Sequence, residues 1–314
     1  MKVSAPDMRA PRFDVVGIGL NSVDILCRVD RYPDFNTKKV LRGMEWHGGG
    51  QAATAMAALA RLGMETALIG AVGDDAEGRF SLTSLVDAGV NTESMVVQPG
   101  LASQLAIIIV QEEGDLEDRG GRTILWRRDV SLRPDDVRED IVKSARIIHV
   151  DGHSAAAEIR SARWAREAGI PVSFDAERVV PGTEELISLT DYLVAAEDFP
   201  AALTGSVDSE EALLKLHALG PLVTAMTLGP RGALAYDGTH FYDSPGFQVE
   251  AVDTTGAGDV FHAGFIYGLL HEFDIPRTLQ FANALAAMSC QEVGGRAGLS
   301  RLEEVEKFIA EHSR

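Results

Sequence analysis

The 314-residue chain is poor in cysteine, in positive charge and in long apolar runs, and each shortage excludes a class of protein. Its two cysteines, Cys27 and Cys290, lie far apart and indicate neither a disulfide framework nor a cysteine-pair metal site. Lysine and arginine total 29 against 47 aspartates and glutamates, giving a net charge of −18. Such a chain lacks the positive surface that attracts nucleic acid or anionic lipid, so we expect neither as a partner.

The apolar stretches are short as well. None reaches the roughly 18 residues that a membrane span needs, and residues 1–20 contain no signal-peptide pattern. We therefore expect a cytoplasmic protein. Hydrophobic residues still make up 46% of the chain, which is enough for a sizeable core.

Strand-like and helix-like segments alternate along most of the chain. The expected strands are 13–19, 65–73, 146–151, 171–175, 191–196 and 222–229, and the expected helices include 52–63, 76–89, 154–169 and 209–220. This alternation predicts an α/β fold, a doubly wound and mostly parallel sheet. Ligands bind such sheets beyond the carboxyl ends of the strands.

Four strand-like segments break the alternation, at 25–33, 38–46, 104–113 and 122–129. They form two pairs, inserted at about 25–46 and 104–129. We interpret them as a small mixed sheet that stands off the main sheet as a lid. The expected organisation is a single domain over residues 1–314 that carries this lid.

Several familiar motifs are incomplete or absent. GIGLNS (17–22) has Ser22 where a dinucleotide-binding loop has its third glycine, and no helix-like run follows it. HGGG (47–50) has no accompanying G-x-S-x-G nucleophile elbow, which excludes an esterase. The chain contains neither a P-loop nor a zinc-type histidine spacing.

One motif, DTTGAGD (253–259), has the residues for phosphoryl transfer. A helix that begins here presents unpaired N–H groups and the positive end of its dipole. The bare residues Gly256, Ala257 and Gly258 let an anion approach those groups, and Asp259 is placed to accept a proton from an attacking hydroxyl. The alternative is an acidic residue that only favours the first helical turn.

The motif resembles the signature of the ribokinase-like (PfkB) carbohydrate kinase family. GGGQAATAMAALARLG (48–63), IGAVGDDAEG (69–78), TLGPRG (227–232) and GGRAG (294–298) are similar to further family segments, in the expected order. The resemblance covers about residues 13–310 and implies a ribokinase-like fold. Within the family, the motifs are most similar to sulfofructose kinases, and the lid to ketohexokinases.

The resemblance implies an ATP-dependent kinase that transfers the γ-phosphoryl group to a sugar hydroxyl. Asp259 would be the catalytic base, and Gly256, Ala257 and Gly258 the anion hole. The implied sugar-binding residues are Asp24, Gly49, Gly50 and Thr54, where Thr54 replaces the usual asparagine. The implied nucleotide-binding residues are Thr227, Gly229, Gly232 and Asn283, although Asn283 would otherwise be a helix-surface amide.

Two metal ions are also implied. Asp253, Thr255 and Gly295 would supply oxygen ligands to a monovalent cation, potassium in this family. ATP brings magnesium, and the usual N-x-x-E element is altered so that only Glu197 remains as a partner for magnesium-bound water.

The sugar itself stays open in the sequence. Lys38, Trp126 and Arg128 of the lid are candidate contacts for a ketose-like sugar, a sugar acid or another anionic derivative. A nucleoside kinase and a non-catalytic sugar or nucleotide sensor are the alternatives. Since exposed lid edges pair readily, we also expect a homodimer that forms through the lid.

Overall fold

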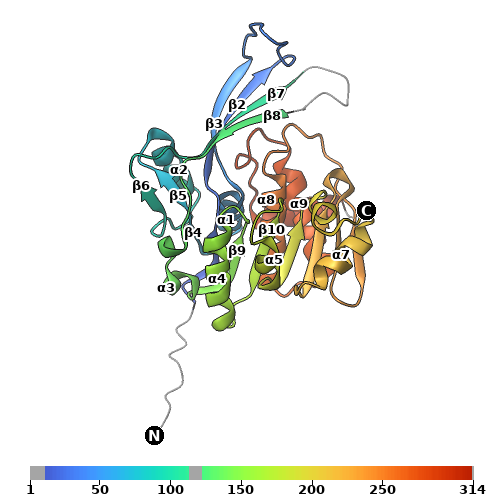
Figure 1. Cartoon of the computed structure of the whole chain (residues 1–314). Coiled ribbons are helices and arrows are strands. Elements are labelled where there is room, and N and C mark those ends of the chain that lie inside the picture. The colour runs from blue at the N-terminus through green and yellow to red at the C-terminus, as the bar shows by residue number, and fades with distance from the viewer. Residues whose placement is uncertain (1–10, 113–121, 313–314) are drawn as a thin grey trace.

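The computed structural model describes residues 11–112 and 122–312 and has an eight-stranded sheet at its centre (Figure 1). Its strands run in the order β14 (Phe241–Ser244), β13 (Ala233–Tyr236), β12 (Val223–Thr227), β11 (Tyr192–Ala195), β10 (Val172–Ala176), β9 (Ala145–Val150), β1 (Phe13–Ile18) and β4 (Thr66–Ile69). The strands from β4 to β12 are parallel to their neighbours, and β13 and β14 add an antiparallel edge.

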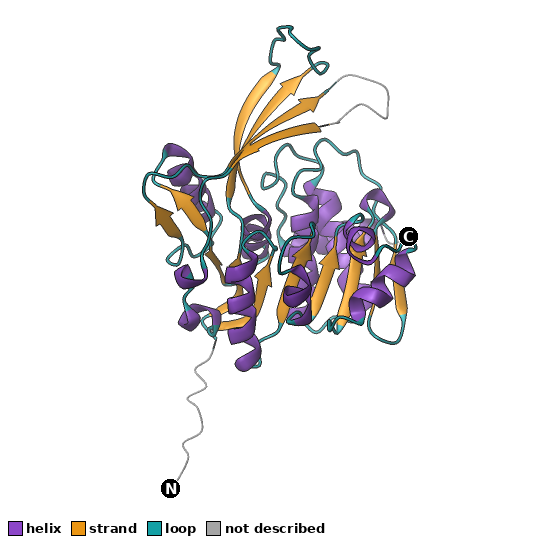
Figure 2. Cartoon of the chain, in the orientation of Figure 1, coloured by secondary structure: helices purple, strands orange, loops and turns teal. Residues whose placement is uncertain are grey.

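Helices cover both faces of this sheet (Figure 2). One face carries α3 (Glu139–Val142), α4 (Ala155–Glu167), α5 (Thr183–Ser188), α6 (Phe199–Thr204) and α7 (Ser209–His217). The other carries α1 (Gln51–Arg61), α8 (Ala257–Leu270), α9 (Ile275–Ser289) and α10 (Leu302–His312). Val15 and Val16 of β1 point to opposite faces and enter separate cores. The prediction of a doubly wound, mostly parallel sheet is confirmed.

A smaller sheet stands off the main one, as the lid prediction requires (Figure 1). Its order is β3 (Gly43–Gly49), β2 (Ser22–Val29), β7 (Leu105–Gln111) and β8 (Arg122–Arg127). The sheet is mixed, because β2 pairs with β7 in parallel whereas the outer pairs are antiparallel. α2 (Ala76–Asp87) packs against the base of β2 and β3. Short 3₁₀ turns at Pro134–Asp136 and Gly229–Arg231 complete the described elements.

Two strand predictions need correction. The segment 65–73 is two strands, because the chain leaves the main sheet after Ile69 and β5 (Ala71–Gly73) pairs with β6 (Val96–Gln98) instead. The segment 38–46 begins as coil, so Lys38 lies outside the lid strand β3. A turn holds this coil: Asn36 has a φ of 60°, and the hydroxyl of Thr37 donates to the carbonyl of Asp34 at 2.7 Å.

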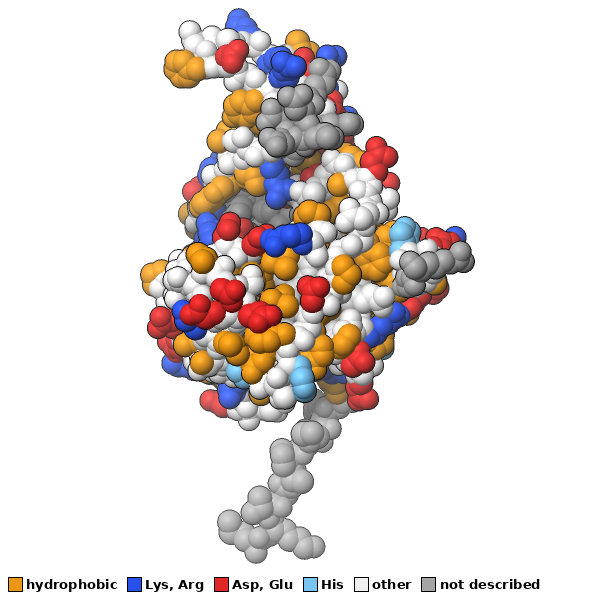
Figure 3. All heavy atoms as spheres, turned by 90° about the vertical axis from the view of Figure 1, so that its right-hand side faces the viewer, with side chains coloured by type: hydrophobic (Ala, Val, Ile, Leu, Met, Phe, Trp, Pro, Cys, Tyr) orange, Lys and Arg blue, Asp and Glu red, His pale blue; other side chains and the backbone are white. Residues whose placement is uncertain are grey.

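No helix in the described ranges is long and apolar enough to cross a membrane. Figure 3 shows acidic side chains scattered over one side of the molecule among apolar and neutral ones. The excess negative charge is therefore distributed on this face, as expected for a solvated surface.

Candidate active site

A cavity of about 550 Å³ lies between the lid and the carboxyl ends of the main-sheet strands. Strands β2, β7 and β8 form its lid side. Residues at the carboxyl ends of β10, β11 and β12 form part of its floor. The N-terminal ends of α1 and α8 complete it. The cavity therefore occupies the position that an open α/β sheet provides for ligands.

The start of α8 faces this cavity. Gly256 is the N-cap, with a φ of 76° that favours glycine. A Cβ added to Gly258 would meet no protein atom within 4 Å, so the cavity reaches the backbone there. Among the described residues, the amides of Gly258 and Asp259 have no hydrogen-bond acceptor. These donors can bind an anion at the positive end of the helix dipole.

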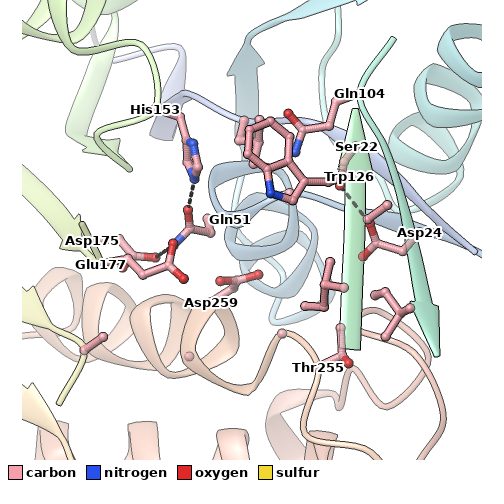
Figure 4. A pocket seen from close by; sticks show the side chains of 18 of the residues that line it. Ser22, Asp24, Gln51, Gln104, Trp126, His153, Asp175, Glu177, Thr255 and Asp259 are labelled. Atoms are coloured by element: carbon pink, nitrogen blue, oxygen red, sulfur yellow. Dashed lines mark hydrogen bonds between the residues drawn. The ribbon is translucent and has the colours of Figure 1, made fainter. Parts of the chain in front are cut away.

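Asp259 lines the same cavity from the first turn of α8, directly after Gly258 (Figure 4). Burial is the main cause that raises the pKa of Asp259 well above the usual range of an aspartate, and the carboxylates of Asp175 and Glu177 raise it further. A carboxylate with a raised pKa is a stronger base than an exposed one. The helix start thus combines anion donors with a candidate general base.

Asp24 lies at the lid side of the cavity and is buried. The hydroxyl of Ser22 donates to Asp24 Oδ1 at 2.9 Å. Burial raises the pKa of Asp24, whereas the Ser22 hydrogen bond and the positive charge of Arg296 lower it. Gly50, with a φ of 93°, caps α1 and also lines the cavity. Carboxylate and backbone groups here fit hydroxyls of a small polar ligand.

Arg296 is partly buried behind this end of the cavity, and the sequence had not indicated its role. Its guanidinium donates to the carbonyl of Gly49 at 2.6 Å and to the hydroxyl of Thr54 at 3.4 Å. Burial lowers the pKa of Arg296 to about 10, so the group remains charged at neutral pH. Thr54 is buried and is not one of the cavity residues, because its hydroxyl faces Arg296. The predicted sugar contact of Thr54 therefore stays a prediction.

The predicted nucleotide residues lie at the other end of the site. Thr227 lines the cavity at the end of β12. Gly232 has a φ of 102°, and a Cβ there would lie 2.0 Å from the carbonyl oxygen of Ser244. Asn283 is buried, and its amide donates to that same carbonyl at 3.0 Å. The structure thus corrects the view of Asn283 as a surface amide, because the side chain joins α9 to β14.

Gly229, at the start of the 3₁₀ turn, and Glu197 lie beside this loop without lining the cavity. Glu197 forms an ion pair with Arg231 instead. Its predicted contact with magnesium-bound water would require that pair to open.

Asp253 connects the two loops that were predicted to hold a monovalent cation. Its Oδ1 accepts the amide of Thr255 at 2.9 Å, and its Oδ2 accepts the amide of Gly294 at 2.9 Å. Gly295 packs directly against Gly256 and the carbonyl of Thr255. The structure therefore brings Asp253, Thr255 and Gly295 together, although the Asp253 carboxylate is used for internal hydrogen bonds.

Sequence reasoning missed a polar chain on the floor of the cavity (Figure 4). Gln51 donates to Asp175 Oδ2 at 3.3 Å and accepts from His153. His262 Nε2 lies 3.0 Å from Asp175 Oδ1, and burial lowers the pKa of His262 to about 3, which keeps the ring neutral. Asp175 lies at the carboxyl end of the parallel strand β10, where ligand-binding residues of such sheets are found. This position is the signal by which Asp175 could have been predicted from the sequence.

His149, Asp175 and His262 also bring metal-ligand atoms within 4.8 Å of one another. The contacts of the Asp175 carboxylate with Gln51 and His262 already account for its two oxygens. His149 Nε2 and His262 Nδ1 are buried and have no hydrogen-bond partner among the described residues.

The lid side of the cavity includes Trp126 and Arg128 as predicted, and also Arg122 and Gln104. Arg122 donates to the hydroxyl of Thr254 at 2.7 Å, so the lid contacts the loop before α8. Lys38 does not line the cavity, since it lies in the exposed coil before β3.

The fold and the cavity define a lidded α/β protein. At the start of α8, two amides without an acceptor in the described part of the chain lie beside a carboxylate of raised pKa. Residues 13–301 match the pfkB family of carbohydrate kinases. The chain belongs to this family, and it has the ribokinase-like fold.

Three comparisons show the range of similar proteins. An ATP-dependent ribose-1-phosphate kinase from Halopiger xanaduensis is 31% identical over 95% of this chain and 98% of its own. A nucleoside kinase from Methanothermobacter thermautotrophicus is 27% identical over 95% of this chain and 96% of its own. A solved structure of a candidate Ribokinase II from E. coli, in complex with ATP and Mg²⁺, matches with a TM-score of 0.84. That structure is 26% identical and covers 96% of this chain and 100% of its own. The finer likeness to sulfofructose kinases and ketohexokinases stays a prediction.

Proposed function

We propose that the protein transfers the γ-phosphoryl group of ATP to a hydroxyl of a ketose-like sugar or sugar derivative. The single observation that carries this proposal is the common cavity. It places the Asp259 carboxylate, the unpaired amides of Gly258 and Asp259, and the Asp24 carboxylate around one space. The relatives named as ATP-dependent and nucleoside kinases support the same reaction type.

In the proposed reaction, Asp259 accepts the proton of the sugar hydroxyl as its oxygen attacks the γ-phosphorus. The new sugar O–P bond forms while the bond from the γ-phosphorus to the bridging oxygen breaks, and ADP leaves. The amides of Gly256 and Gly258 in the predicted anion hole, with that of Asp259, stabilise the negative charge on the transferred group, whereas the Ala257 amide donates to the carbonyl of Thr254 at 3.3 Å.

Asp24, Gly49 and Gly50 would orient the sugar, and Thr227, Gly229 and Gly232 would hold ATP. The loop geometry supports the nucleotide assignment, since Gly232 allows the loop to pass close to the backbone at Ser244. Asn283 would support this loop through Ser244.

Magnesium would enter with ATP, as in the E. coli structure, and would reduce the charge of the phosphates. Cavity-lining carboxylates fit a hard cation. Glu177 is exposed and lines the cavity, whereas Glu197 is paired with Arg231, so we assign the contact with magnesium-bound water to Glu177.

Potassium would bind where Asp253, the Thr255 carbonyl and the Gly295 carbonyl meet. The oxygen-rich backbone at this point supports the assignment. Higher kcat in KCl than in tetramethylammonium chloride of equal ionic strength is the expected result. Equal rates in the two salts would remove potassium from the proposal.

A nucleoside acceptor is the second candidate, favoured by the similarity to a nucleoside kinase. Its base would have to pack against the lid side of the cavity. Ala106, Ile108 and Ile124 are apolar there, but Arg122 and Arg128 line the same side. The charged lining favours a sugar, and the kinases among the relatives argue against a sensor.

We also propose that the chain works as one cytoplasmic domain that dimerises through the outer face of its lid. On this face Trp46, Ile25, Ile107 and Leu125 form one row across the four lid strands. Trp46 is 43% exposed and Leu125 is 56% exposed. A row of large apolar side chains on a small sheet supports burial against a second copy.

An ADP-release assay over ribose, fructose, sugar phosphates, sugar acids and adenosine tests the reaction. The Asp259→Asn variant should lose about 10²- to 10⁴-fold in kcat while it still binds ATP. Glu272→Gln, an exposed change just beyond the other end of α8, is the matched control and should keep full activity. If Asp259→Asn kept most of its activity with normal ATP binding, the base assignment would be wrong.

A further inference from the structure

A second cavity, of about 300 Å³, adjoins the first one where the end of lid strand β8 faces the loops after β9 and β10. Five residues line both cavities: Trp126, Arg128, His153, Glu177 and Arg178. Because these walls are shared, one ligand can extend from the space above Asp259 into the side cavity. The charge and polarity of the shared residues therefore indicate which chemical group the far end of the substrate carries.

Two arginines reach this junction from different parts of the fold. Arg128 follows lid strand β8, and Arg178 follows β10 of the main sheet. Arg128 forms no ion pair among the described residues. The one ion pair of Arg178 among the described residues is a long contact with Glu177, from Nε to Oε2 at 3.8 Å, and both side chains are about half exposed. Such a pair is weak and leaves the guanidinium available to a ligand.

His153 lies between these arginines and the catalytic floor. Its Nδ1 lies 3.3 Å from Arg178 Nη2, and its Nε2 contacts Gln51. Figure 4 shows the ring extending toward Gln51, which in turn reaches Asp175. These contacts connect Arg178, through His153 and Gln51, to the floor of the first cavity.

The side cavity also contains two carboxylates, and backbone amides take up the oxygens of one of them. Asp151 is buried, and its oxygens accept the amides of Leu20, Ala52 and His153 at 2.6 to 3.1 Å. Glu177 is the remaining carboxylate. The cavity thus holds two guanidinium groups, one without an ion pair among the described residues and one with only a long pair, in a chain whose net charge is −18.

We propose that the sugar acceptor carries an anionic oxygen group, a phosphate ester or a carboxylate, which binds Arg128 and Arg178 in the side cavity. This inference rests on the proposed kinase function. Guanidinium groups bind such anions through paired N–H donors. Trp126, which is 57% exposed on the same strand end as Arg128, covers the sugar ring between the anion and the reacting hydroxyl (Figure 4).

The test compares kcat/KM for neutral and anionic acceptors in the ADP-release assay. The probes are ribose, ribose 1-phosphate, ribose 5-phosphate, fructose, fructose 1-phosphate, fructose 6-phosphate and gluconate. At least one anionic probe should exceed every neutral one, and the panel distinguishes phosphate from carboxylate. Arg128→Gln and Arg178→Gln should each raise KM for the preferred anionic probe by about 10- to 100-fold. KM for ATP should stay within about 2-fold in both variants.

Arg127→Gln is the matched control, since Arg127 is exposed on β8 next to Trp126 and does not line either cavity. It should leave the KM values unchanged. Better turnover of neutral sugars than of every anionic probe would overturn the anion site but not the kinase. Equal effects of Arg127→Gln and Arg128→Gln would also overturn it. No transfer to any acceptor would instead contradict the proposed function.

Discussion

Gly49 leaves the space that the carboxylate of Asp24 occupies. A Cβ built on Gly49 would lie 2.1 Å from Asp24 Oδ2, which is closer than real atoms approach. The two residues lie on neighbouring strands, with Ser22 of β2 directly opposite Gly49 of β3. The Asp24 carboxylate can therefore occupy its position only because residue 49 is glycine. Asp24 lines the cavity where the sugar is proposed to bind.

Gly49→Ala should therefore displace the Asp24 carboxylate. We expect KM for the sugar to rise about 10-fold or more, since a shifted acid loses its hydrogen bonds to the ligand. KM for ATP should change less than about 2-fold, because the nucleotide binds at the other end of the site. Initial rates with each substrate varied in turn give both constants. An unchanged sugar KM in a folded variant would refute the link between Gly49 and Asp24.

Gly258 and Gly264 offer a contrast within one helix. A Cβ at Gly258 meets no protein atom, whereas one at Gly264 would lie 2.7 Å from the Cα of Ala282 on α9. Gly258→Ala should keep the thermal stability and lower kcat about 10- to 100-fold, because its methyl group enters the anion site. Gly264→Ala should lower the free energy of unfolding by about 1–3 kcal/mol. Calorimetry and kcat together test both, and a normal kcat for Gly258→Ala would contradict the anion hole.

The helix start at the proposed phosphate end of the site could be predicted because its signal is local. Seven consecutive residues, DTTGAGD, contain the helix start, the bare turn and the proposed base. The alternation of strands and helices is also a local pattern, and it predicted the main sheet. The break after Ile69 could not be seen in the same way, because β4 and β5 form one continuous apolar run and differ only in their partners.

The sugar end depends on contacts between distant segments. Thr54 faces Arg296, which is 242 residues away in the chain, so its surroundings cannot be inferred from the motif alone. Asp175 and Gln51 meet 124 residues apart. The strand-like sequence of residues 38–46 predicted that Lys38 lies in a lid strand. The turn at Asn36 places it in coil instead. Contacts between residues that are distant in the sequence determine the surroundings of these side chains, and the periodicity of the sequence does not reveal such contacts.

The pH dependence of kcat should reflect the raised pKa of Asp259. The base works only when deprotonated, so kcat should fall as the pH decreases through that pKa, above the usual carboxylate range. Glu177→Gln removes a negative neighbour that raises this pKa. The acid limb of the profile should then move to lower pH. Glu184→Gln, an exposed change on α5, should leave the limb in place, and a shift toward higher pH in Glu177→Gln would contradict the electrostatic assignment.

Asp253→Asn should loosen the connection between the loops at 253–256 and 294–296. Both carboxylate oxygens accept hydrogen bonds, and an asparagine must turn an NH₂ group toward one of those donors. We expect the free energy of unfolding to fall by about 1–3 kcal/mol and kcat to fall with it. Urea unfolding and initial rates measure these changes. Asp243→Asn on the exposed edge of β14 serves as the control, and equal stability of the two variants would show that Asp253 has no such role.

Leu125→Asp should convert the proposed dimer into a monomer. Leu125 is directly opposite Ile107 on the outer face of the lid, whereas the next residue, Trp126, lines the cavity. A charge in the apolar row that Leu125 shares with Ile107, Ile25 and Trp46 would be buried without a partner in the dimer, and this is costly. Sedimentation velocity should show a loss of mass for this variant but not for Leu214→Asp, an exposed leucine on α7 that is 43% accessible. A monomeric parent protein, or a dimer that survives Leu125→Asp, would exclude assembly through this face.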